Sequence, residues 1–166
     1  MKGIAVLQEL LEKQFSFCHY MLRANLEGIG HGASLVRPEP AGNCLNWIVG
    51  HIVSSRSSFL PLLGQEELWD TGKAAPYKRD ADPSSNSFEP IALDEILADL
   101  DRSQKRLLAG LPSLTPERQS EPSPINPFHQ KEETLGGLFT GLAFHEAYHV
   151  GQTGILRRMA GLGRTV

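Results

Sequence analysis

The sequence predicts an all-α protein, an antiparallel four-helix bundle with long connections that forms a single domain over residues 1–166. Three observations lead to this prediction. Apolar residues recur at steps of three and four along four segments, as in amphipathic helices, and no segment alternates as a β-strand does. The length, with 40% hydrophobic and 21% charged residues, matches one globular domain. Four such helices bury their apolar stripes by packing on one another.

The first two helices follow from their apolar stripes and from the residues at their ends. The first has about seven turns and ends before Gly28 and Gly30, which favour a helix end. A Pro-containing loop follows, and Asn43 is the predicted N-cap of a second helix that ends near Gly64. The first stripe consists of Ile4, Leu7, Leu11, Phe15, Cys18, Leu22 and Leu26, and the second of Leu45, Ile48, Val49, Ile52, Phe59 and Leu63.

A long polar connection precedes the third helix. Residues 65–90 are rich in Pro, Ser, Asp and Gly, which predicts a segment laid over the bundle. The third helix ends at Pro112, and four prolines within residues 113–134 restrict any helix there to a short one. Thr134 is the predicted N-cap of the last helix. The third stripe consists of Leu93, Leu97, Leu100, Leu107 and Leu111.

The last helix has the most regular pattern. Its seam positions are separated alternately by four and three residues, a heptad spacing expected to face the bundle axis. Several glycines lower its helix propensity, by up to about 1 kcal/mol each relative to alanine, so the helix needs tight packing or open volume beside it. The seam consists of Leu138, Leu142, His145, His149, Gln152, Leu156 and Met159. Two histidines therefore replace core residues.

These two histidines indicate a metal site. His145 and His149 are four residues apart, so their imidazoles project from one helix face at a separation that one metal ion can bridge. Two buried imidazoles without partners would each cost about 1 to 3 kcal/mol in unmet hydrogen bonds. Catalytic zinc sites use three protein ligands. His51 is the best third candidate because it lies mid-helix beside the apolar stripe, and Gly50 and the nearby serines would leave room for a ligand.

Two other interpretations of the histidines remain. They could be ordinary core histidines that are hydrogen-bonded within the bundle. The segment H145-E-A-Y-H149 also matches the H-E-x-x-H motif of zinc proteases, in which Glu146 would be the general base. A further ligand would then lie downstream, but none of the 17 residues after His149 is His, Asp, Glu or Cys. The sequence therefore disfavours a peptidase.

Three residues are candidates for a pocket or for supporting the ligands. Gln152 could orient an imidazole or a bound water, or be a core residue bonded to another helix. Ser55 lies one turn after His51. Arg56 falls near the centre of the second stripe, where a buried guanidinium needs a carboxylate, and a structural ion pair is favoured over an anionic substrate. Glu146 lies about 100° from the seam, which predicts a surface or helix-pairing residue.

The segments N46-W-I-V-G-H51 and H145-E-A-Y-H149-V-G-Q-T-G-I-L-R-R together resemble the DinB/YfiT-like superfamily of metal-dependent proteins. The likeness spans nearly the whole chain in helix order, length and histidine positions, and the HxxxHxGQ block is its most specific part. It implies a four-helix bundle, commonly dimeric, with nickel or zinc on His51, His145 and His149. Activities among relatives are mostly thiol-dependent, including transfer of bacillithiol or mycothiol to electrophiles and maleylpyruvate isomerisation.

Three functions follow from such a site. A metal ion on three neutral imidazoles strongly acidifies a thiol or a water in its open position. It could present a low-molecular-weight thiolate to a small electrophile, as a transferase does. Alternatively, metal hydroxide could hydrolyse an ester or amide with help from a carboxylate base. The orientation of Glu146 favours the thiolate route. The third interpretation is a metal-binding bundle without turnover, such as a sensor.

Composition limits the partners and the location. The net charge of −3 and the absence of a dense Lys/Arg run argue against a nucleic-acid partner. Early charged residues and the lack of a run of about 18 apolar residues argue against a signal peptide or a membrane span, so we expect a cytoplasmic protein. Cys18 and Cys44 are expected to be small buried hydrophobes. A small-molecule substrate and a homodimer are the expected partners.

Overall fold

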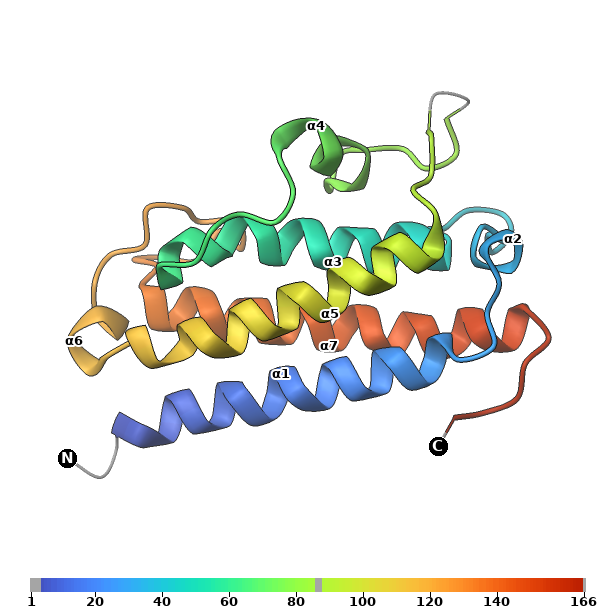
Figure 1. The fold of residues 1–166 in the computed structure, drawn as a ribbon. Helices are drawn as coiled ribbons and strands as arrows, with labels where there is room; N and C mark the ends of the chain where they lie inside the picture. The colour runs from blue at the N-terminus through green and yellow to red at the C-terminus, as the bar shows by residue number, and fades with distance from the viewer. Residues whose placement is uncertain (1–3, 86–87, 166) are drawn as a thin grey trace.

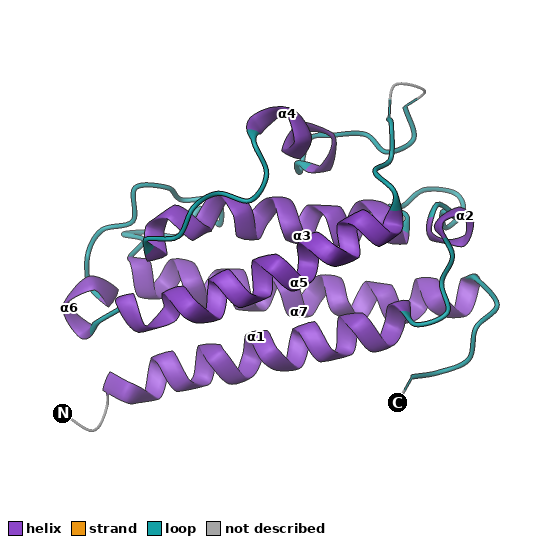
Figure 2. Cartoon of the chain, viewed as in Figure 1, coloured by secondary structure: helices purple, strands orange, loops and turns teal. Residues whose placement is uncertain are grey.

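The computed structural model describes residues 4–85 and 88–165, and within them every regular element is helical (Figures 1 and 2). This confirms the all-α fold class. None of these helices combines the length and apolar character that crossing a membrane requires. The long helices are α1 (Ile4–Leu26), α3 (Leu45–Phe59), α5 (Leu93–Gly110) and α7 (Leu135–Met159). The short ones are α2 (His31–Ser34), α4 (Thr71–Ala74), α6 (Pro116–Gln119) and three 3₁₀ turns at Leu60–Leu63, Ala75–Tyr77 and Leu111–Ser113.

The four long helices lie side by side as two pairs. Helix α1 packs mainly against α7, and α3 packs mainly against α5. Figure 1 shows that the members of each pair run in the same direction and that the two pairs run in opposite directions. Antiparallel packing therefore holds between the pairs and not within them. Because α3 and α5 are parallel, the chain returns along the bundle between them, and the described residues 64–85 and 88–92 do so across the outer side of α3.

Most helix ends agree with the sequence. Gly64 has a left-handed φ of 70° and ends the 3₁₀ extension of α3. The Thr134 side chain accepts a hydrogen bond from the Gly137 amide at the start of α7. The prediction for Asn43 was wrong by one residue: Cys44 is the N-cap, because its carbonyl accepts the first helical hydrogen bond, from Ile48. The single turn α2 was not predicted, since four residues show no periodicity.

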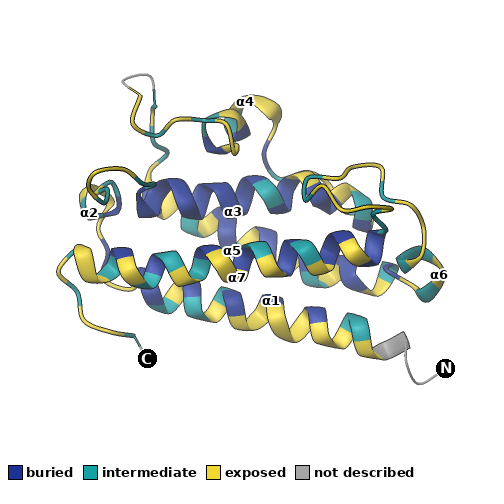
Figure 3. Ribbon diagram, turned by 180° about the vertical axis from the view of Figure 1, so that it is seen from behind, coloured by how far each residue is buried: buried dark blue, intermediate teal, exposed yellow. Residues whose placement is uncertain are grey.

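The inward faces of the helices form the core (Figure 3). Cys18 and Cys44 are both buried, as expected. The seam of α7 needs correction at its end, because Met159 is 45% exposed. A straight α-helix drifts from a strict seven-residue repeat, and the buried face of α7 is instead centred on residues such as Glu146 and Thr153.

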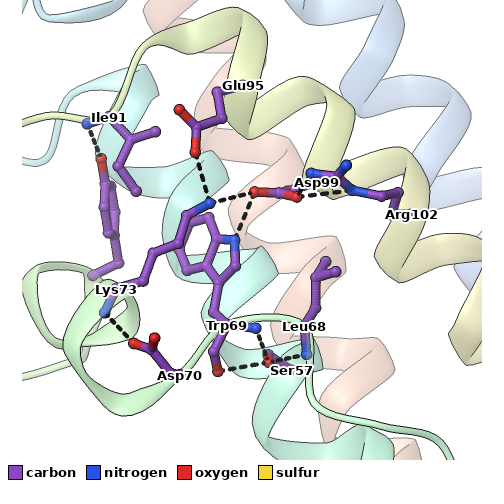
Figure 4. Close-up of polar contacts among 10 residues, drawn as sticks. Ser57, Leu68, Trp69, Asp70, Lys73, Ile91, Glu95, Asp99 and Arg102 are labelled. Carbon is purple, nitrogen blue, oxygen red and sulfur yellow. Dashed lines mark hydrogen bonds and ion pairs between the residues drawn. The ribbon is translucent and has the colours of Figure 1, made fainter.

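Side-chain hydrogen bonds anchor the connection between α3 and α5 to both helices (Figure 4). On α3, the hydroxyl of Ser57 accepts hydrogen bonds from the amides of Leu68 and Trp69 at 2.9 and 2.8 Å. On α5, the buried carboxylate of Asp99 accepts from the Trp69 indole at 2.7 Å and from Lys73 Nζ at 2.9 Å. The connection is therefore a fixed part of the fold.

Tyr77 is a further anchor of this connection, and its carbonyl oxygen contacts His51 on α3. Its hydroxyl accepts from the Ile91 amide at 2.8 Å and donates to Asn46 Oδ1 at 3.0 Å. Its ring lies against Gly50, where an added Cβ would be 2.2 Å from a ring carbon. The expectation that Gly50 leaves room for a ligand was wrong, because the Tyr77 ring fills that space.

Replacing Gly50 with alanine is expected to destabilise the protein by about 1 to 3 kcal/mol, because Tyr77 is fully buried and cannot move aside freely. Urea unfolding measures the effect. The matched control is Gly151→Ala in α7, where nothing lies within 4 Å of the added Cβ, and a gain of up to about 1 kcal/mol is expected there. Equal stability of the Gly50→Ala variant and the unchanged chain would contradict the tight packing of Tyr77.

Candidate metal centre

His51 on α3 and His145 and His149 on α7 lie together, as predicted, and their imidazoles point at one another. The Nε2 atom of His145 is 3.0 Å from that of His51 and 3.1 Å from that of His149. Potential ligand atoms of all three lie within 4.8 Å of one another. Nitrogen atoms around a single metal ion with bonds of about 2.0 to 2.1 Å are roughly 2.9 to 3.4 Å apart. The triad could therefore hold one ion.

The ring of His51 is fixed from two sides. Its Nδ1 atom is 2.6 Å from the carbonyl oxygen of Tyr77. A carbonyl only accepts, so Nδ1 carries the proton and the neutral ring keeps a lone pair on Nε2. Trp47 stacks on the imidazole at a centroid distance of 4.7 Å, and its indole donates to the Pro76 carbonyl at 3.1 Å. The connection that crosses the bundle thus orients the ligand on α3.

The ring of His149 is held in the same way by its own helix. Its Nδ1 atom lies 2.7 Å from Oε1 of Gln152, one turn further along α7. The amide oxygen accepts, which again assigns the proton to Nδ1 and the lone pair to Nε2. Gln152 therefore orients an imidazole, one of the two roles considered for it.

The Nε2 atom of His145 lies between the Nε2 lone pairs of His51 and His149 and can donate a hydrogen bond to only one of them. Its Nε2 atom carries at most one proton, which can be donated to His51 or to His149 but not to both at full strength. Its Nδ1 atom is buried and has no hydrogen-bond partner within the described chain. Unpaired buried polar atoms are costly, and a cation between the three Nε2 atoms would satisfy the lone pairs of all three, with the proton of His145 then on Nδ1. The donor set fits a divalent metal ion.

Burial keeps these imidazoles neutral. It lowers the pKa of His51 from 6.5 to about 4 and that of His145 to about 3, and it also lowers the pKa of His149. Charge repulsion from Arg79 adds to the first two shifts. Since metals bind neutral imidazole, the triad is in its ligating form at neutral pH.

The same shifts predict how the stability of the metal-free protein depends on pH. The unfolded chain takes up protons on these histidines near pH 6.5, while the folded chain resists protonation until much lower pH. The free energy of unfolding should therefore fall as the pH drops from 6.5 to 5, by about 2 kcal/mol or more. Urea unfolding with chelator tests this. The free energy of unfolding of His145→Gln is expected to vary less with pH. If that of the unchanged chain did not vary between pH 6.5 and 5, the prediction would be contradicted.

Arg56 and Glu146 form a structural ion pair away from the cavities. The guanidinium binds both carboxylate oxygens at 2.7 and 2.8 Å, and the two side chains are 0% and 1% exposed. This agrees with the structural role favoured for Arg56. Of the two positions predicted for Glu146, the one between helices is confirmed, because Glu146 on α7 binds Arg56 on α3. The position on the surface is wrong, because the side chain is buried. Helices α1 and α3 both contact α7, so its buried face is wider than the seam alone.

Two cavities lead to the triad, one of about 600 Å³ and one of about 440 Å³. Ser55 lines the larger one, beside His51 and His145, which agrees with its expected position. Arg79 and Phe128 line both cavities, and Asn43 lines the smaller one. The position of these three residues at the site was not predicted, because they lie in connections, where no periodic spacing shows which side chains reach the site.

The sequence matches the family model described as the DinB superfamily over residues 14–153, a region that includes all three histidines. The chain belongs to the DinB superfamily. The resemblance stated from the histidine motifs is thereby confirmed, and the DinB match extends from the third turn of α1 to within two turns of the end of α7. A comparison with curated proteins found no match.

Proposed function

We propose that His51, His145 and His149 bind one zinc or nickel ion, and that this centre transfers a low-molecular-weight thiol to a small electrophile. The supporting observation is the convergence of three Nε2 atoms while the partners of His51 and His149 hold the protons on Nδ1. Imidazole nitrogens suit both metals. When bound, such an ion would lower the pKa of a thiol or water at its open position.

The position of Glu146 favours thiol transfer over hydrolysis, and Asp80 is the carboxylate that lines the larger cavity beside His51 and His145. Hydrolysis benefits from a carboxylate base near the attacked bond. Glu146 is held in the buried pair with Arg56 and faces the core. Thiol transfer needs no protein nucleophile or base once the thiol is deprotonated. The chain's contribution would be to hold the imidazoles, to shield one side of the site with Trp47, and to admit both reactants through the cavities.

A turnover assay tests this proposal. Metal-loaded protein is mixed with a panel of low-molecular-weight thiols and the electrophile monobromobimane, and thioether formation is followed by fluorescence. We expect turnover with at least one thiol and its loss in His149→Ala. His31→Ala is the matched control, because that ring bonds the Leu93 amide at the start of α5 and is expected to leave turnover unchanged. No thiol affinity and no turnover with any thiol would favour a metal-binding bundle without catalysis.

We further propose that the protein is a homodimer formed through the outer face of α1 and α7. These two helices pack together and carry large exposed apolar side chains at helical spacing. They are Val6, Leu10, Phe17 and Tyr20 on α1 and Ile155 and Met159 on α7, whereas the exposed rings of Phe144 and Tyr148 line the smaller cavity. Such a patch favours burial against a second copy. Sedimentation should give twice the chain mass, and Phe17→Glu should give a monomer; a monomeric unchanged chain would contradict the proposal.

A further inference from the structure

Arg79 and Phe128 lie where the cavities around the triad meet. Both line the two cavities that reach the histidines, and both also line a third of about 720 Å³. The Phe128 ring lies 6.3 Å from that of His145 between centroids. It also rests on Gly141, where an added Cβ would be 2.6 Å from a ring carbon. Phe128 is thus a wall of the site, and Arg79 is at its mouth.

The fold brings Arg79 to this mouth. It follows Tyr77 by two residues, and Tyr77 is held by its buried hydroxyl and by the hydrogen bond of its carbonyl to His51. The guanidinium itself has few partners. Its hydrogen bond to the Pro127 carbonyl is long, at 3.4 Å, and no ion pair with a carboxylate is found within the described residues. Most of its five donors are available to a ligand.

The lining of the 440 Å³ cavity suits an anion with a flat apolar body. Trp47, Phe128, Phe144 and Tyr148 contribute aromatic rings. Arg79 adds a positive charge, and no acidic residue is among the described residues that line this cavity. Cavities with aromatic walls and a few polar groups hold small molecules by the walls and orient them by the polar groups. Arginine is well suited to carboxylate or phosphate, because its planar fork binds two oxygens at once.

We propose that the substrate of this site is a small molecule with an anionic oxygen group on a flat apolar body, and that Arg79 selects it by binding the anion. This inference rests on the proposed function, because the proposed reaction places the reactive end of the substrate at the three histidines. Lys78 lines the larger cavity and adds positive charge, which Asp80 on the same cavity offsets. Arg79 lines all three cavities, and Glu132 and Glu133 line only the one of 720 Å³, so Arg79 is the residue we assign to the anion.

Binding of three probes that share a phenyl ring tests the proposal. Benzoate, phenyl phosphate and neutral benzamide are titrated by calorimetry into the full chain, both metal-free and zinc-loaded. At least one of the anions should bind about tenfold more tightly than benzamide, and the stronger of the two identifies carboxylate or phosphate as the preferred group. In Arg79→Met the affinity for that anion should fall about tenfold or more in the metal-free chain, with benzamide unaffected.

Two variants provide controls. Arg79→Lys should retain part of the affinity for the anion, because it keeps the charge and loses the fork. Arg23→Met removes an equal charge on α1 and should bind like the unchanged chain. Equal binding of benzamide and both anions, or unchanged anion affinity in Arg79→Met, would overturn the proposal. A chain that binds anions through Arg79 but holds no metal would instead refute the proposed metal centre alone.

Discussion

Replacing Glu146 with alanine is expected to destabilise the protein by about 3 to 5 kcal/mol, the largest effect of any single substitution considered. The reason is the guanidinium of Arg56, which is fully buried and would lose the carboxylate that binds it through two hydrogen bonds. The other contacts of Arg56, to Ser103 Oγ at 3.2 Å and the Leu100 carbonyl at 3.4 Å, are neutral and cannot replace a charge. Urea unfolding and the thermal midpoint measure the effect.

A double substitution separates two causes of lost stability: leaving Arg56 without its carboxylate, and losing the ion pair itself. Arg56→Met combined with Glu146→Leu replaces both charges with apolar groups of similar size, and should be considerably more stable than Glu146→Ala. If the free energy of unfolding of Glu146→Ala were within about 0.5 kcal/mol of that of the unchanged chain, Arg56 would not depend on this carboxylate.

Removing the metal is expected to have the second large effect. An ion that binds only the folded state stabilises it by about 2.7 kcal/mol at 100 times its dissociation constant, and by about 4.1 kcal/mol at 1,000 times. Zinc or nickel should therefore raise the thermal midpoint, and chelator should reverse the rise. His51→Ala should abolish the response, because two ligands on one helix rarely hold a metal firmly.

His31→Ala is the matched control for this experiment, since its side chain lies outside the triad and should leave the metal response intact. The thermal midpoint is recorded with metal and with chelator for each chain. A midpoint that is equal in both conditions for the unchanged chain would contradict metal binding by the folded protein.

The sequence predicted the features of the fold that depend on periodicity. The stripes located all four long helices, and Gly64 and Thr134 located two of their ends. It could not show that α3 and α5 are parallel, because their relative direction depends on how the connection between them crosses the bundle. That crossing depends on tertiary contacts of single residues, such as Trp69 with Asp99 and Tyr77 with Gly50.

The sequence predicted the candidate site better on helices than in connections. The spacing of His145 and His149 was informative because both lie on one helix, and His51 was found from its position beside a stripe and from the family resemblance. The burial of Glu146 was not predicted, because the heptad seam describes contacts on one side of α7, whereas α1 and α3 both pack against this helix. Arg79 and Phe128 were missed, since nothing in the local pattern brings a connection over the site.

Metal content tests the central claim most directly. Protein purified under metal-replete conditions is analysed for zinc and nickel, beside a His145→Ala variant whose folding is checked by circular dichroism. The triad predicts one divalent ion per chain, and much less than one in the variant, because His145 contributes the Nε2 atom that lies between the other two. Less than one ion per chain in the unchanged protein, or equal content in the folded variant, would contradict a metal centre on these histidines.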